Sequence, residues 1–371
     1  MVGRELYLDC AASTPVFPEV AESVKKAMLS VYGNASSPHR KGEEAFGEIK
    51  RAREVFAREL GCKPWEIVFT SGATESNNLA IWGGVLGGIR STGRKKILIS
   101  AIEHSSVFGS AKALGRGGYT VIEIPVDSHG AIDIAVFERM LDSSVALVSI
   151  IHGSNELGVV QDLREIGVLC RRRGALFHTD ASQSFGKKRI TVRELGVDLL
   201  SASAHKLGGP KGVGLLYVRE GIGLKPLVYG GGQEKGIRSG TENVPGIVGF
   251  VKALELGKQQ PWKKVKASRD FFALTLGKLG GTVFEGRRML PGIVRITLPG
   301  LDAPRVVLAL SEKGIYCSTG SACDSKRDDS RALRAVGFSA EAIKGSLRFS
   351  ISQPLSLKEI KRVIAALKEL L

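Results

Sequence analysis

The sequence predicts an α/β fold in which a mostly parallel sheet is covered by helices and a smaller α+β part follows. Short apolar runs alternate with amphipathic stretches over most of the chain. Runs that are apolar throughout are typical of strands buried on both faces, as in parallel sheets between helices. The final third loses this alternation and mixes helices, short strands and a Gly/Ser/Cys stretch. A chain of 371 residues is long enough for one large domain and one smaller domain.

The expected large domain spans residues 14–255 and contains the regular alternation. Its strand candidates are Glu66–Thr70, Lys96–Ser100, Thr120–Pro125, Val145–Ile151, Ala175–Asp180, Leu199–Ala202 and Gly214–Val218. Amphipathic stretches with helical spacing lie between many of them, at Gly42–Leu60, Asp133–Leu141 and Leu163–Arg173. These patterns predict helices packed on both faces of the sheet.

The expected small domain comprises residues 1–13 and 256–371, with a cysteine loop at about 316–330. Its helices are predicted at Lys264–Leu279 and Pro304–Lys313, and its strands at Thr282–Phe284, Ile293–Thr297 and Ser346–Ser350. The C-terminal stretch Leu355–Leu371 starts with Ser356 and Glu359, which have the spacing of a capping box. Apolar residues then recur at helical intervals, so a packed C-terminal helix is predicted.

Composition and charge favour a cytoplasmic enzyme over a membrane or nucleic-acid-binding protein. The formal net charge is +16, but the basic residues are scattered and no nucleic-acid-binding motif accompanies them. A solvated basic surface is therefore the preferred interpretation. The five cysteines contain no CxxC pair, and no apolar run is long enough to cross a bilayer. With no secretory signal, this pattern predicts free thiols in a reducing compartment, and no metal site.

Four short segments place polar residues where a strand ends. Lys206 follows an apolar strand and precedes a glycine-rich turn, which suits an imine to an aldehyde cofactor. Asp180 ends another strand, where a buried carboxylate needs a partner such as a protonated pyridine nitrogen. Taken singly, a solvated loop lysine and a capping aspartate are the simpler alternatives.

The other two segments are His104, after a third strand, and Ala73-Thr74 in a Ser/Gly/Thr turn. A histidine in that position could stack on an aromatic ring and transfer protons. Amides and hydroxyls at the start of a helix bind anions such as phosphate. A core or cap histidine and an ordinary helix cap are the alternatives. Because all four segments fall at strand ends, and ligands gather at the carboxyl ends of such strands, together they indicate one binding site.

The order of these motifs resembles the class V aminotransferases, which are fold type I pyridoxal 5′-phosphate (PLP) enzymes. Within them it is most similar to NifS/IscS-type cysteine desulfurases. The resemblance extends from Leu8–Pro15 to Arg348–Ser350. Its most specific segments are Gly72-Ala73-Thr74-Glu75-Ser76-Asn77-Asn78, Asn155-Glu156-Leu157-Gly158 and Arg238-Ser239-Gly240-Thr241.

This resemblance implies a role for each matching residue. Lys206 is the Schiff-base lysine, Asp180 the partner of the pyridinium nitrogen and Gln183 the contact of the ring hydroxyl. His104 stacks on the ring, and Asn155 and Arg348 orient the substrate carboxylate. The phosphate is expected to contact Ala73, Thr74, Ser203, His205 and, from the neighbouring subunit, Thr241. A homodimer follows from that last contact.

The reaction is indicated by Cys323, which ends a small-residue stretch and precedes a highly charged run. The nearby Lys326 and Arg327 would favour its thiolate form. The segment resembles the Gly-Ser-Ala-Cys motif that carries the sulfur-accepting cysteine. The resemblance then implies conversion of L-cysteine to L-alanine, with Lys206 as the base and a persulfide formed on Cys323. The acceptor would be an iron–sulfur scaffold or a tRNA-thiolation enzyme. A selenocysteine lyase or another class V aminotransferase-like enzyme is the alternative.

Overall fold

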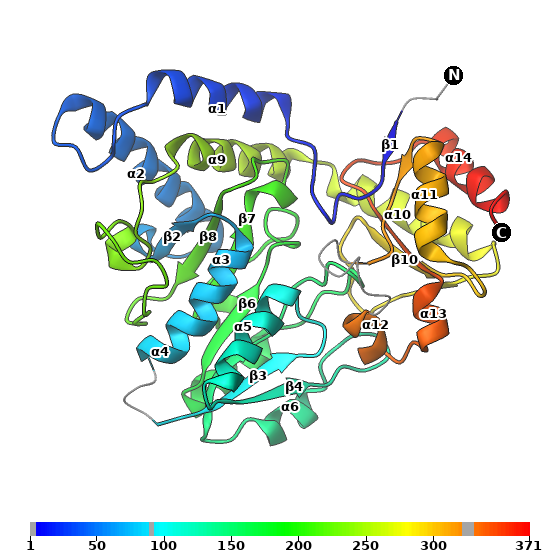
Figure 1. Cartoon of the computed structure of the whole chain (residues 1–371), viewed down its shortest axis with the longest axis horizontal. Helices are drawn as coiled ribbons and strands as arrows, with labels where there is room; N and C mark the ends of the chain where they lie inside the picture. The colour runs from blue at the N-terminus through cyan, green and yellow to red at the C-terminus, as the bar shows by residue number, and fades with distance from the viewer. Residues whose placement is uncertain (1–4, 89–92, 321–329) are drawn as a thin grey trace.

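The computed structural model describes residues 5–88, 93–320 and 330–371 (Figure 1). Its main sheet has seven strands in the order β2-β8-β7-β6-β5-β3-β4. In that order the strands are Ile67–Thr70, Gly214–Val218, Leu199–Ser203, Leu176–Asp180, Val145–Ser149, Lys96–Ser100 and Thr120–Ile124. β8 runs antiparallel to both of its neighbours, and every other neighbouring pair is parallel. The predicted mostly parallel sheet is therefore confirmed.

The strand directions bring the predicted site segments to one edge of this sheet. β3, β5, β6 and β7 are mutually parallel, and β2 shares their direction because β8 is antiparallel to both β2 and β7. The carboxyl ends of these strands therefore lie on the same side. The segments that follow them are the ones in which the sequence predicts functional residues.

Helices cover both faces of the main sheet, as the fully apolar strands require. On β3, Leu98 belongs to the core that also contains residues of α2 (Arg40–Leu60), α7 (Arg164–Arg173) and α9 (Val244–Gln259). Its neighbours Ile97 and Ile99 point the other way, into a core with residues of α4 (Gly84–Gly88) and α5 (Ser105–Arg116). This alternation of side chains along a strand places one core on each face.

A second, smaller sheet lies beside the first and has the order β12-β10-β9, with strands Ser346–Ser350, Ile293–Thr297 and Thr282–Val283. It shares a core with α10 (Trp262–Gly277), α11 (Ala303–Glu312) and α14 (Leu357–Lys368). Near the start of the chain, β1 (Leu6–Tyr7) pairs with β11 (Ile315–Tyr316). The N-terminal residues therefore pack with C-terminal elements, while the domain boundaries given above stay a prediction.

The remaining helices are mostly short and lie in the connections. They are α1 (Pro18–Ser30), α3 (Ala73–Asn78), α6 (Ile134–Met140), α8 (Val192–Leu195), α12 (Arg331–Ala335) and α13 (Ala340–Lys344). A π-helical turn at Leu79–Gly83 joins α3 to α4, and 3₁₀ turns occur at Pro64–Glu66, Ala204–Lys206 and Glu234–Gly236. In the described part of the chain, no helix combines the length and apolarity that crossing a membrane requires.

The predicted elements occur within a few residues of their expected positions. The predicted capping box of the C-terminal helix is confirmed, because Ser356 and Glu359 satisfy each other's backbone N–H groups. The pattern did not predict α1 or α9, which contact each other. α9 lies at the boundary of the main core and is apolar on more than one side, so it has no clear polar stripe.

The aromatic cluster between α2, α9 and the sheet gives a test of core packing. The ring of Phe56 lies 4.6 Å from that of Phe250 and 5.9 Å from that of Phe69, measured between centroids. Replacing Phe56 by Ala should lower the free energy of unfolding by roughly 3–5 kcal/mol through lost burial and a cavity. Phe271→Ala removes the same group from a side chain that is 47% exposed, and should change stability by less than about 0.5 kcal/mol. Urea unfolding of both variants measures the difference; equal losses would contradict this account.

Candidate active site

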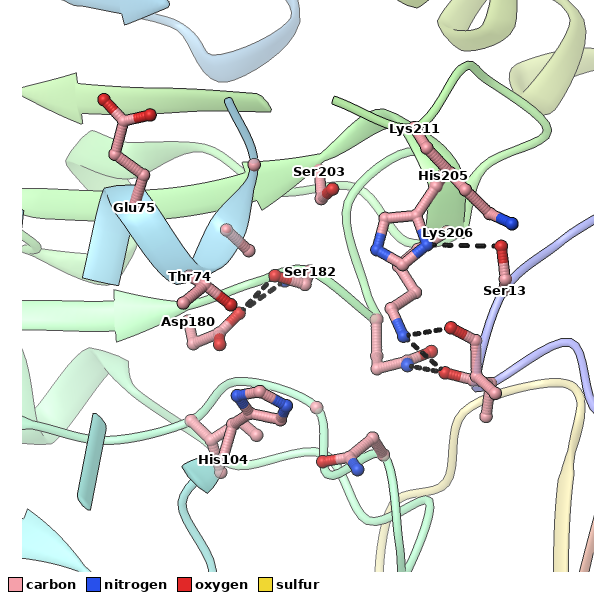
Figure 2. Close-up of a pocket in the computed structure, with 18 of the residues that line it drawn as sticks. Ser13, Thr74, Glu75, His104, Asp180, Ser182, Ser203, His205, Lys206 and Lys211 are labelled. Carbon is pink, nitrogen blue, oxygen red and sulfur yellow. Dashed lines mark hydrogen bonds between the residues drawn. The ribbon is translucent and has the colours of Figure 1, made fainter. Parts of the chain in front are cut away.

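A cavity of about 430 Å³ lies where the carboxyl ends of the main-sheet strands meet the N-terminal segment (Figure 2). Ten of the residues predicted from the sequence line it: Ala73, Thr74, His104, Asn155, Asp180, Gln183, Ser203, His205, Lys206 and Arg348. Residues from five connections therefore meet in one space. The predicted site is assembled by the sheet topology, although the role of each residue stays a prediction.

Two predicted residues are not in this set. Thr241 is exposed, in the loop before α9, and does not line the cavity of its own chain. That position agrees with a role in a neighbouring subunit but does not test it. Cys323 lies outside the described residues, so its position relative to the cavity also stays a prediction.

Lys206 ends the 3₁₀ turn that follows β7, and its side chain reaches toward the N-terminal segment (Figure 2). Its Nζ donates to the carbonyl oxygens of Ala11, at 2.7 Å, and Ala12, at 2.8 Å. The following turn needs a glycine, because Gly208 has φ +79° and an added Cβ would lie 2.2 Å from the ring of Phe17. The chain can therefore turn immediately after the lysine and leave its amine in the cavity.

Asp180 ends β6, and its side chain is buried at 4% exposure. One carboxylate oxygen, Oδ1, accepts hydrogen bonds from the backbone N–H and the hydroxyl of Ser182, at 2.9 and 2.5 Å. The other oxygen, Oδ2, accepts from Nδ2 of Asn77 at 2.7 Å. Within the described residues, Asp180 forms no salt bridge with a cationic side chain. A buried carboxylate that has only neutral donors is suited to a cationic ligand atom, such as a protonated ring nitrogen.

His104 is the N-cap of α5, and its Nδ1 accepts a hydrogen bond from the backbone N–H of Ser106 at 3.2 Å. The cap role and the predicted stacking role are compatible, because the same side chain also lines the cavity. Its neighbour Glu103 is fully buried and bonds the hydroxyl of Ser100 at 2.8 Å. Burial is the main cause that raises the pKa of Glu103 to about 8, so its carboxyl is neutral at pH 7.

The end of the cavity near α3 is rich in hydrogen-bond donors and positive charge. Thr74 lies in the first turn of that helix and Ser203 ends β7, while His205 and Lys211 follow β7 (Figure 2). Burial lowers the pKa of His205 to about 4, with further lowering by the charges of Lys206 and Lys211. The imidazole is therefore neutral at pH 7, whereas the lysines supply charge. This set can bind a phosphate group.

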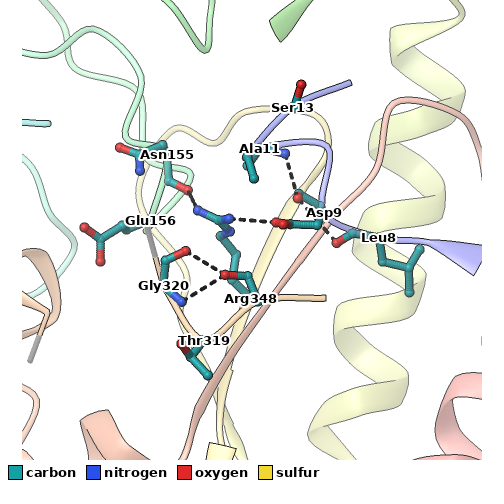
Figure 3. A network of polar contacts seen from close by, with 12 residues as sticks. Leu8, Asp9, Ala11, Ser13, Asn155, Glu156, Thr319, Gly320 and Arg348 are labelled. Atoms are coloured by element: carbon teal, nitrogen blue, oxygen red, sulfur yellow. Dashed lines mark hydrogen bonds and ion pairs between the residues drawn. The ribbon is translucent and has the colours of Figure 1, made fainter. Parts of the chain in front are cut away.

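Arg348 marks the other end of the cavity and comes from β12 (Figure 3). Its Nη1 donates to the backbone oxygen of Asn155 at 2.9 Å, and its Nη2 pairs with Asp9 at 2.8 Å. This guanidinium is only 1% exposed, so its ion pair with Asp9 is not a contact of the protein surface. A buried arginine that lines a cavity can bind a carboxylate with its planar fork.

Several residues of the site had no predicted role. Backbone oxygens of Ala11 and Ala12 bind Lys206, and the first of them also accepts from Nε2 of Gln183 at 2.7 Å. Asp9 pairs with Arg348, while Asn77 supports Asp180. Backbone carbonyls leave no sequence signal. The side chains of Asp9 and Asn77 lie within the motifs that carried the resemblance, but spacing alone does not reveal their partners.

The comparisons with known proteins agree with this site. The family described as aminotransferase class-V matches residues 6–363. The chain belongs to this family. A relative named cysteine desulfurase IscS, from Dictyoglomus turgidum, is 38% identical over 99% of this chain and 95% of its own length. The sequence-based resemblance to NifS/IscS-type cysteine desulfurases is thus confirmed.

Solved structures of similar proteins show the same fold. A NifS-like protein superposes with a TM-score of 0.91 at 33% identity, covering 99% of this chain and 98% of the other. A structure described as SspA in complex with cysteine has a TM-score of 0.83 at 36% identity, covering 95% of this chain and 100% of the other. The fold class predicted from the sequence is confirmed.

The charge around His205 leads to a prediction for pH dependence. Its pKa is lowered in the folded protein, so the unfolded chain binds more protons between about pH 4 and 6.5, and folding stability falls as the pH decreases through that window. Replacing Lys211 by Ala removes a repelling charge and should raise the pKa of His205. NMR titration of the imidazole resonances measures this shift. Lys112→Ala, on exposed α5 surface, is the control; an unchanged pKa in the Lys211 variant would contradict the assignment.

Proposed function

We propose that this protein is a PLP-dependent cysteine desulfurase that converts L-cysteine to L-alanine and transfers the sulfur to Cys323 as a persulfide. The observation that carries the proposal is the arrangement in one cavity of Lys206, Asp180 and Arg348. The amine and the buried carboxylate suit the two reactive ends of the cofactor. The guanidinium suits the carboxylate of an amino acid.

The residues present fit PLP. Lys206 would hold the aldehyde carbon, Asp180 the ring nitrogen and His104 a ring face, while Gln183 would contact the ring hydroxyl. The phosphate would be held by Ala73, Thr74, Ser203 and His205, with Thr241 of a neighbouring subunit completing its contacts in a homodimer. When bound, PLP supplies an electron sink for the pair released at the substrate Cα. Asp180 would maintain this capacity, because a carboxylate at this position would favour a proton on the ring nitrogen.

Substrate orientation depends on Arg348 and Asn155. The guanidinium is fixed by Asp9 and by the backbone oxygen of Asn155, so it is preorganised before the amino acid enters. Its planar N–H groups would bind the carboxylate of L-cysteine. The Cα–H bond would then be held near Lys206, which lines the same cavity.

Proton transfer is assigned to Lys206 and His104. Once its Nζ is released as a free amine, Lys206 takes the Cα proton of the substrate. His104 would return a proton during the later steps, and its cap hydrogen bond supports this role by fixing the ring. The carbonyl oxygens of Ala11 and Ala12 would hold the Nζ amine once it is released from the cofactor.

Sulfur transfer is assigned to Cys323. Its thiolate attacks the sulfur atom of the bound cysteine; the new S–S bond forms as the Cβ–S bond breaks. The electron pair of the broken bond stays on the carbon skeleton, which takes up protons and leaves as L-alanine. The persulfide then passes to a sulfur-acceptor protein, either an iron–sulfur scaffold or a tRNA-thiolation enzyme.

Two variants separate the cofactor from the sulfur chemistry. Lys206→Ala should lose the imine absorbance band and reduce turnover by at least about 1,000-fold, because both the attachment point and the base are removed. Cys323→Ala should keep the imine band but abolish persulfide formation and sulfide release. Absorbance scans with PLP, combined with assays of sulfide and alanine from L-cysteine, measure both effects.

The wild-type protein also gives a direct test. A protein that stays colourless after addition of PLP would refute the cofactor assignment. Undiminished release of sulfide by Cys323→Ala in the absence of any added thiol would refute the persulfide role while leaving the cofactor assignment intact.

A further inference from the structure

Two buried arginines face each other in the small sheet. Arg295 on β10 is the register partner of Arg348 on β12, so both side chains extend from the same face. Their exposed fractions are 0% and 1%. The pKa of Arg295 is lowered to about 10, chiefly by burial; the charge of Glu156 opposes this effect and that of Arg348 adds to it. Like charges opposite each other destabilise a strand pair, so other contacts must offset the repulsion.

The contacts of Arg295 join three separate parts of the chain. Its Nε donates to the backbone oxygen of Glu156 at 3.2 Å, and its Nη1 donates to the backbone oxygen of Thr319 at 2.5 Å. The side chain of Glu156 in turn accepts a hydrogen bond from the hydroxyl of Ser330 at 2.5 Å. We call Glu156 and Arg295 the flank pair, because Thr319 and Ser330 lie on either side of Cys323 in the sequence.

The flank pair lies next to Arg348, which lines the active-site cavity. Asn155, next to Glu156, gives its backbone oxygen to Arg348. Ser318, next to Thr319, exchanges two backbone hydrogen bonds with Arg348, at 3.1 and 2.6 Å. Arg348 therefore contacts both the segment of Asn155 and Glu156 and the segment of Ser318 and Thr319 (Figure 3). Cys323 follows Thr319 by only four residues, so the contacts around Arg348 fix the chain just before the cysteine segment.

A role in core stability alone does not account for Arg295. Within the described residues its buried Nη2 has no hydrogen-bond partner, and a buried charge is less stabilising than an apolar side chain of similar volume. An arginine is needed where two acceptors in different segments must be held by one rigid planar group. Glu156 and Thr319 present such acceptors.

We propose that Arg295, together with Glu156, is a positioning residue for sulfur transfer: Arg295 fixes the Thr319 flank and the backbone of Glu156, whose side chain fixes the Ser330 flank, relative to Arg348 and the bound substrate. This inference rests on the proposed function. Removal of the Cα proton by Lys206 does not require the flanks. Formation of the S–S bond does, because the thiolate of Cys323 must meet a substrate held by Arg348. The two steps should therefore respond differently to loss of Arg295.

The test compares these two steps in the holoenzyme. The rate of Cα–H exchange of L-cysteine with deuterated solvent is measured by NMR in a Cys323→Ala background, with and without Arg295→Gln. Persulfide formation on Cys323 is measured in a single turnover by quenching and mass spectrometry. We expect exchange to stay within about twofold, whereas persulfide formation slows by at least about tenfold, since misplacement by about 1 Å can cost 100-fold.

Three further variants define the cause. Arg295→Lys keeps the charge but cannot span both acceptors, and should rescue persulfide formation by less than about threefold. Glu156→Ala frees Ser330 and should slow the same step. Arg269→Gln is the matched control, because Arg269 is 3% exposed and bonds the backbone oxygen of Ile293 without touching either flank. It should leave both rates unchanged.

The outcomes separate this inference from the proposed function. Equal slowing of exchange and persulfide formation by Arg295→Gln would show that the residue acts through Arg348 or general stability, and would overturn the inference. Unchanged persulfide formation would also overturn it. If Arg295→Gln does not fold, Arg295→Lys and Glu156→Ala decide by the same criterion. Absence of exchange in the Cys323→Ala parent would instead contradict the proposed function.

Discussion

The buried negative charge of Asp180 is the constraint on which the rest of the site depends. A carboxylate at 4% exposure is costly unless its oxygens are bonded, and here Ser182 and Asn77 supply only neutral donors. Among the described residues no cationic side chain forms a salt bridge with it, and in the proposed function a cationic ring atom of the cofactor would balance its charge. That contact would also orient the cofactor, because Lys206 and the donors near α3 would then contact its other groups.

The N-terminal segment carries the second constraint. It crosses from the small sheet to the cavity, so the same few residues contact both Lys206 and Arg348. Carbonyl oxygens of Ala11 and Ala12 hold the amine, and the carboxylate of Asp9 holds the guanidinium. One short stretch of chain thus contacts both the proposed cofactor-binding lysine and the proposed substrate-binding arginine.

The strands of the main sheet were predictable because short apolar runs alternate with amphipathic stretches. The site was predictable because polar residues follow the carboxyl ends of these strands, where ligands bind in such folds. Ten of the twelve predicted site residues line the cavity. They come together because the carboxyl ends of the parallel strands lie at the same edge of the sheet. The partners of these residues were not predictable. Ala11 acts through a backbone oxygen, which its side chain does not reveal. Arg295 is the single charged residue of an otherwise mostly apolar strand, and that pattern alone does not indicate its contacts. Arg295 pairs with Arg348 between β10 and β12, which are far apart in the sequence. The periodicity of apolar residues within each strand does not predict which strands pair.

The individual signals were weak because each functional residue also has an ordinary structural role. His104 caps α5, as its simpler alternative predicts, and Arg348 forms a buried ion pair with Asp9. These contacts do not compete with chemistry; they fix the side chains that the chemistry uses. A histidine held by a cap bond keeps its ring in one orientation, and an arginine held by a carboxylate loses little freedom when a substrate binds. The structural and functional interpretations of each residue are therefore compatible. What distinguishes this site from a set of unrelated caps and ion pairs is that all these side chains line one cavity.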